Sequence, residues 1–155
     1  MKFRPYQLLI TLSLALLIVA MVMPIINLIE PNGATAIMDN FAYKAADGAI
    51  SRSVVALGVV LIITALVNLF ALFVSMFSNF ALQKRSTILT MLLLAGYYIL
   101  LLIYLLILTE DAAVVMLSAM FFPLLALVAN AITFTLIRKQ EAKIIAKALG
   151  FRLRD

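Results

Sequence analysis

Long uncharged stretches divide the chain into segments of the length that a membrane requires. Asp, Glu, Lys and Arg are absent from Pro5–Ile29, Ser53–Gln83, Ser86–Thr109 and Ala112–Ile137. A helix of about 20 apolar residues crosses a hydrocarbon core of ~30 Å, and in lipid the backbone polar groups must be paired within the segment itself. The pattern therefore predicts four transmembrane helices, over about residues 8–29, 54–77, 88–108 and 112–137.

The fold class that follows is all-α, an integral membrane four-transmembrane-helix bundle with a short amphipathic basic C-terminal helix. The chain has 155 residues, of which 66% are hydrophobic and 12% are charged, and its mean hydropathy is +1.21. A water-soluble domain of this length cannot hide so much apolar surface. We therefore expect residues 1–155 to form a single membrane domain, with an outer loop over 30–53 and a tail over 138–155.

The connecting segments are short. Turn residues at Pro31–Gly33 end the first helix. Beyond them we expect either a plain ordered connector or a short interfacial helix at about Ala36–Ala46, with Phe41 and Tyr43 in the headgroup layer. The tight turn at Thr109–Asp111 predicts that the third and fourth helices are antiparallel neighbours.

Prolines fall within two of the predicted spans. Pro24 and Pro123 each lack the N–H group that an interior helix position uses. We expect both residues to kink their helices.

The distribution of charge predicts the orientation. Four crossings put both termini on one side, and that side carries ten of the 12 basic residues: Lys2, Arg4, Lys84, Arg85, Arg138, Lys139, Lys143, Lys147, Arg152 and Arg154. By the positive-inside rule, both termini are expected in the cytoplasm of a bacterium whose inner membrane holds the protein. The net charge of +5 is then a topology signal, and we expect no nucleic-acid partner. The first span resembles a signal peptide, but its 22-residue apolar run is longer than a signal core, so we expect it to be retained.

The residue types exclude several chemistries. Cys and His are absent, which removes thiolates and the commonest metal ligand and general base. The predicted spans contain no ionisable side chain, so proton relays and carboxylate ion sites have nothing to use. We expect no cofactor and no catalysis. The remaining enzymatic alternative rests on solvated acids of the outer side, which are Glu30, Asp39, Asp47, Glu110 and Asp111.

Neutral polar residues and small residues share one face in two of the spans. They are Thr64, Asn68, Ala71 and Ser75 in the second span, and Ala126, Asn130 and Thr133 in the fourth. Small faces let helices approach closely, and Asn or Ser side chains bond across the contact. These faces are predicted to be internal seams of the bundle or a docking face for another membrane protein.

Tyr97 and Tyr98 fall near the middle of the third span, at a depth similar to that of Asn68. A phenol in lipid needs a hydrogen-bond partner. We expect one of them to face the second or fourth helix and to bond Asn68 or a backbone carbonyl. A role in binding a substrate is the alternative.

A basic helical tail follows the fourth span. Lys139, Lys143 and Lys147 recur at intervals of four residues, next to Arg138, and Gly150 is expected to end the helix. A basic amphipathic segment beside a membrane is typical of one that contacts anionic lipid headgroups. The alternative is that these charges only set the topology.

The chain resembles a known family in helix 4 and its exit. Residues 123–130 read Pro-Leu-Leu-Ala-Leu-Val-Ala-Asn and residues 137–141 read Ile-Arg-Lys-Gln-Glu, after a basic N-terminus with Arg4 and Gln7. These features resemble an uncharacterised bacterial four-span membrane family, domain of unknown function 4293. The resemblance implies the four-span topology and no established activity.

Three functions remain open. The first is a non-catalytic accessory or assembly subunit of a larger inner-membrane complex, with lipids and other integral membrane proteins as partners. The second is a small transporter or channel for a neutral or lipidic substrate, lined by Ser75, Asn68, Tyr97 and Asn130. The third is the enzyme at the outer interface.

Overall fold

A computed structural model describes residues 4–29, 33, 35–44, 50–77, 79–108, 113–116 and 118–152 of the chain. The predicted turn at Thr109–Asp111 lies outside the described residues. The helices are α1 (Pro5–Val22), α2 (Val55–Val74), α3 (Phe80–Leu108) and α4 (Phe122–Arg152), with a 3-10 turn, η1 (Ser118–Phe121), before α4. The strands are β1 (Ile26–Ile29), β2 (Thr35–Met38), β3 (Ala42–Lys44), β4 (Ile50–Ser53) and β5 (Ala113–Met116).

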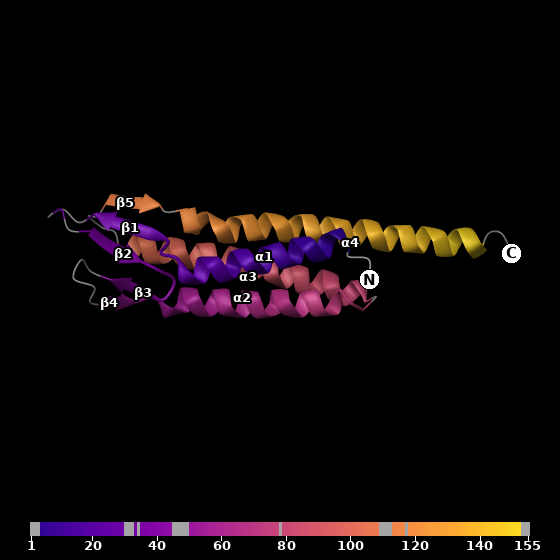
Figure 1. Ribbon diagram of the computed structural model, residues 1–155, viewed down its shortest axis with the longest axis horizontal. Coiled ribbons are helices and arrows are strands. Elements are labelled where there is room, and N and C mark those ends of the chain that lie inside the picture. The colour runs from indigo at the N-terminus through magenta and orange to yellow at the C-terminus, as the bar shows by residue number, and fades with distance from the viewer. Residues whose placement is uncertain are drawn as a thin grey trace.

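The four helices form one elongated antiparallel bundle (Figure 1). Packing contacts join α1 to α2, α2 to α3, α3 to α4 and α4 back to α1, so consecutive helices are neighbours in a closed ring. All four are long and apolar enough to cross a membrane. The predicted four-helix membrane architecture is therefore confirmed, and the chain is a multi-pass membrane protein.

Each helix buries one stripe whose residues are spaced alternately three and four positions apart. This spacing averages 3.5 residues, the repeat of left-handed knobs-into-holes packing. The stripe on α3 was not anticipated from the sequence, and the first half of this helix contributes the polar residues Gln83, Thr87 and Thr90 to it. The buried stripes comprise Tyr6, Ile10, Ser13, Leu17 and Ala20 on α1; Leu57, Leu61, Thr64, Asn68 and Ala71 on α2; Gln83, Thr87, Thr90, Leu94, Tyr97 and Leu101 on α3; and Ala126, Asn130, Thr133 and Ile137 on α4.

Polarity is inverted relative to a water-soluble bundle. Ser13, Asn68 and Asn130 are at most 1% exposed, whereas Leu66 on α2 is 61% exposed and Leu92 on α3 is 64% exposed. Exposing a leucine side chain to this extent costs free energy in water. It does not in hydrocarbon, because lipid tails are as apolar as leucine. The arrangement is the one expected when lipid is the solvent of the lateral surface.

An antiparallel sheet covers the end of the bundle that lies opposite the chain termini (Figure 1). Its strand order is β4-β3-β2-β1-β5, and β1 pairs with β2 in the register Ile26 with Met38. Ile26 and Leu28 of β1 are buried with Ala36 and Met38 of β2, in one cluster with helix residues that include Leu17. The sheet thus packs its apolar face onto the helix ends.

This sheet corrects the all-α expectation for the outer segments. The interfacial helix predicted at about Ala36–Ala46 is wrong, because β2 and β3 occupy its described part. Strands satisfy one another's backbone groups, and exposed and buried residues alternate along β2 with the period of a strand rather than that of a helix.

Both predicted proline kinks are wrong, because each proline lies at a helix end. The α1 helix stops at Val22, seven residues before the predicted end at Ile29, and Pro24 follows its C-cap residue Met23. Pro123 is the second residue of α4, where a missing N–H leaves no bond broken. The predicted fourth span therefore begins too early.

The α4 helix projects beyond the other three helices at the end of the bundle that holds the termini (Figure 1). It continues from Ile137, the last fully buried residue of its stripe, to Arg152. At 1.5 Å per residue the part from Arg138 onward is about 22 Å long. The basic segment is a continuation of α4, as the sequence predicts, but the predicted stop at Gly150 is wrong.

Candidate functional site: the polar interior

A serine links three helices at the centre of the bundle. Asn68 Nδ2 on α2 donates to Ser13 Oγ on α1 at 2.9 Å, and Asn130 Nδ2 on α4 donates to the same oxygen at 2.8 Å. Asn130 Nδ2 also donates to the Ala126 carbonyl at 2.8 Å, whereas Asn68 Oδ1 has no partner among the described residues. The amides thus converge on one buried hydroxyl.

The predicted small faces of α2 and α4 lie inside this bundle. Thr64 and Thr133 donate their hydroxyl hydrogens to backbone carbonyls four residues earlier, so neither offers a free donor. Ala71 and Ala126 are buried beside them and let the backbones approach. Sequence reasoning missed Ser13; its place in the α1 stripe at steps of three and four is the signal that identifies it.

Ser75, the last of the predicted α2 residues, joins α2 to the beginning of α1. Gln7 Nε2 donates to Ser75 Oγ at 3.2 Å and to its carbonyl at 3.3 Å. The Gln7 Oε1 atom accepts from the Arg4 backbone N–H at 3.1 Å, which pairs a backbone donor at the start of α1. The Gln7 side chain thus pairs a backbone N–H at the start of α1 and a backbone carbonyl at the end of α2.

A second polar site lies where the sheet meets the bundle. The Tyr97 hydroxyl on α3 donates to Asn40 Oδ1 at 2.6 Å, and Asn40 Nδ2 donates to the Ala20 carbonyl of α1 at 2.6 Å. Tyr97 and Asn40 are fully buried. Tyr97 thus bonds Asn40 rather than Asn68, and the expectation that one of the two tyrosines bonds Asn68 or a backbone carbonyl is met by Tyr98.

Tyr98 bonds a backbone carbonyl. Its hydroxyl donates to Met120 O in η1 at 2.8 Å, just before α4 begins. The rings of Tyr97 and Tyr98 meet edge to face, with centroids 5.3 Å apart. The two tyrosines therefore fix α3 against the sheet turn and against the start of α4.

The residues on either side of Asn40 hold it in place. Asp39 Oδ1 accepts the backbone N–H groups of Phe41 and Ala42, at 2.8 and 2.7 Å, in a tight side-chain-closed turn. The ring of Phe41 lies against Gly58 on α2, where an added Cβ would be 2.8 Å from Phe41 Cζ and closer to two other ring atoms. One turn thus contacts α1, α2 and α3.

The basic residues of α3 and α4 lie at the other end of the molecule. Lys84 Nζ on α3 is 2.6 Å from Glu141 Oε2 on α4, and the Arg138 guanidinium is 5.9 Å from the Phe134 ring centroid. Lys139, Lys143 and Lys147 are exposed on the projecting part of α4. Their predicted contact with lipid remains a prediction.

The described residues give little support to metal or acid–base chemistry. They include no group of three or more potential metal ligands among His, Cys, Asp and Glu. Of the outer acids, Asp39 is committed to the turn and lies 3.7 Å from Lys44 Nζ. Glu30, Asp47, Glu110 and Asp111 lie outside the described residues.

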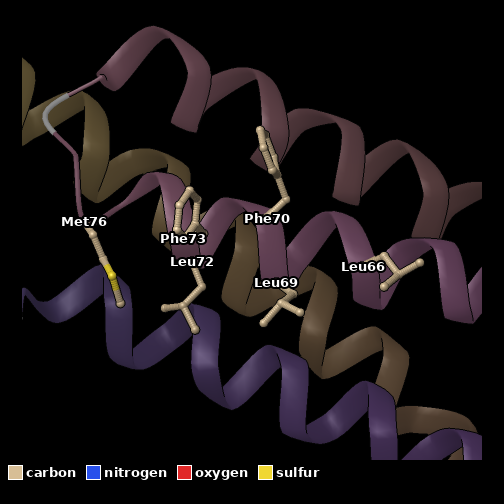
Figure 2. Close-up of a pocket in the computed structure, with 6 residues that line it drawn as sticks. All are labelled: Leu66, Leu69, Phe70, Leu72, Phe73 and Met76. Atoms are coloured by element: carbon tan, nitrogen blue, oxygen red, sulfur yellow. The ribbon is translucent and has the colours of Figure 1, made fainter.

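Two open grooves run along the side of α2 that faces away from the bundle interior. The first, of about 490 Å³, is lined by Leu66, Leu69, Phe70, Leu72, Phe73 and Met76. Figure 2 shows Leu69, Leu72 and Met76 reaching toward α1 and Phe70 toward α3. The second groove, of about 380 Å³, lies between α2 and α3. Both face the lateral surface rather than the polar interior.

Comparison with known proteins gives one match. A family model described as a domain of unknown function, DUF4293, covers residues 7–148 of the chain. No curated protein and no solved structure matches the chain.

Proposed function

The chain belongs to the DUF4293 family, a family of unknown function, and from that premise we propose that it is a non-catalytic accessory or assembly subunit of a larger bacterial inner-membrane complex. Its partners would be other integral membrane proteins and the surrounding lipid. Both termini would lie in the cytoplasm, because the basic residues gather at their end of the bundle.

The state of the polar interior supports this proposal over a transporter or channel. The side chains that would line a path are Ser75, Asn68, Tyr97 and Asn130, and each is at most 1% exposed. They bond to glutamine, serine or asparagine side chains of neighbouring elements. A path for a substrate needs some of these groups to face a cavity. Here they hold helices together.

The single observation that carries the proposal is the projecting part of α4. Residues 142–150 are exposed on every side, although Ile144, Ile145 and Leu149 are apolar and are 46 to 53% exposed. Lys143 and Lys147 lie on the opposite side of this helix. A free helix with one apolar and one basic side supplies a docking element for a partner chain or for the anionic headgroups of the cytoplasmic leaflet.

Native purification tests the proposal. The full chain, extracted in mild detergent, is expected to migrate with other membrane proteins that mass spectrometry identifies. Reversing the three lysines with K139E, K143E and K147E is expected to release them, while the matched K139R, K143R and K147R variant keeps them. A solitary monomer in mild detergent, or equal recovery with both triple variants, would contradict the proposal.

A further inference from the structure

The groove between α2 and α3 is lined by apolar side chains and one charged side chain, as a site for an amphiphilic molecule would be. Five of its lining residues are apolar, namely Leu66, Val67, Phe70, Leu82 and Leu89, and the other two are Arg85 and Ser86. Leu66 and Phe70 also line the neighbouring groove on α2, so the apolar surface continues beyond the first groove. The Ser86 hydroxyl is already used, since it donates to the Leu82 carbonyl at 2.9 Å.

Arg85 differs from the adjacent lysine. Lys84 Nζ is neutralised by Glu141, whereas Arg85 is exposed and forms no ion pair with any described residue. It stands in the second turn of α3, at the end of the bundle that holds the termini, while Leu89 lies one turn farther toward the sheet. A guanidinium is suited to phosphate, because its fork of donors matches the phosphate oxygens.

We propose that this groove binds one anionic phospholipid. The phosphate lies against the Arg85 guanidinium, and an acyl chain follows Leu89, Phe70 and Leu66 toward the bundle centre. A transmembrane helix of a partner is a poorer occupant, because it would cover the unpaired Arg85 without supplying a charge. The inference goes beyond the proposed function and does not depend on the identity of any protein partner.

Native mass spectrometry of the full chain from nanodiscs that contain equal phosphatidylglycerol and phosphatidylcholine tests the site. The wild type is expected to retain one phosphatidylglycerol, R85K to retain it weakly, and R85Q to retain about tenfold less, the factor that 1.4 kcal/mol gives. K84Q is the matched control, because it removes a positive charge from the neighbouring position of α3 but outside the groove. Equal losses with R85Q and K84Q would overturn the proposal and indicate general charge attraction.

A second pair of variants tests the acyl part of the groove while leaving Arg85 intact. L89W fills the groove and is expected to lower phosphatidylglycerol retention. L92W places the same side chain on the exposed surface of α3 outside the groove and is expected to leave retention unchanged. Unchanged retention in L89W would overturn the assignment. So would a cross-link to a second protein chain from a photoreactive residue placed at position 89 of the otherwise unchanged chain.

Discussion

Tyr97 on α3 donates a 2.6 Å hydrogen bond to Asn40 in the turn between β2 and β3, and both side chains are fully buried. Asn40 also donates to the carbonyl of Ala20, near the end of α1. Helix ends leave such carbonyls unpaired. The sheet is therefore anchored to the bundle by an amide that satisfies one helix and accepts from another.

Removing the Tyr97 hydroxyl should loosen this anchor. Y97F leaves Asn40 Oδ1 buried without its donor, which costs about 1–3 kcal/mol. Hydrogen exchange should become faster at backbone amides of β2 and β3 than at those of the α2 interior. The control is Y104F, because Tyr104 is only partly buried and its hydroxyl has no hydrogen bond in the described structure. Equal exchange in both variants would show that the bond does not hold the sheet.

Ser13 should matter more than its size suggests. S13A removes the oxygen that accepts from Asn68 and Asn130, so two buried donors lose a partner. A destabilisation of about 1–3 kcal/mol follows, although bonds in a membrane bundle average only about 0.6 kcal/mol each. The thermal unfolding midpoint in detergent measures it. T11A is the control, since Thr11 is exposed and bonds its own helix. A midpoint no lower in S13A than in T11A would contradict the prediction.

Two glycines should respond oppositely to the same substitution. G58A places a methyl group against the ring of Phe41 and should destabilise the protein by about 1–3 kcal/mol, as overpacking does. G96A in α3 meets nothing within 4 Å and should be neutral or stabilise the helix by up to about 1 kcal/mol. Thermal unfolding compares them directly. If G58A is as stable as G96A, the ring of Phe41 moves aside freely.

The ion pair between Lys84 and Glu141 should contribute little. Its side chains are 29 and 30% exposed, so solvent screens the attraction and the expected contribution is about 0–1 kcal/mol. E141Q should lower the unfolding midpoint slightly, and the double exchange K84E with E141K should restore it. A loss that the exchange does not restore would mean that Glu141 acts through another contact.

The proposed orientation can be measured directly, because the chain has no cysteine. K147C on the projecting α4 should react with a membrane-impermeant maleimide only after the cells are permeabilised. T35C, on the exposed side of β2, should react in intact cells. The reverse pattern would place the termini outside.

The sequence by itself determined the environment and the number of helices. The length and apolarity of each uncharged run by themselves imply a helix in hydrocarbon. That conclusion therefore required no knowledge of which residues contact one another. It also located the buried faces of α2 and α4, because Asn68 and Asn130 are costly to expose to lipid.

Only the tertiary structure decided how the polar groups pair and where the helices end. Ser13 lies 117 positions from Asn130, and Tyr97 lies 57 from Asn40. Local pattern does not encode such distant contacts. The apolar run through Ile29 satisfies a membrane helix and a buried strand equally well, and Ile26–Ile29 is a strand because β2 and β5 lie on either side to accept its hydrogen bonds.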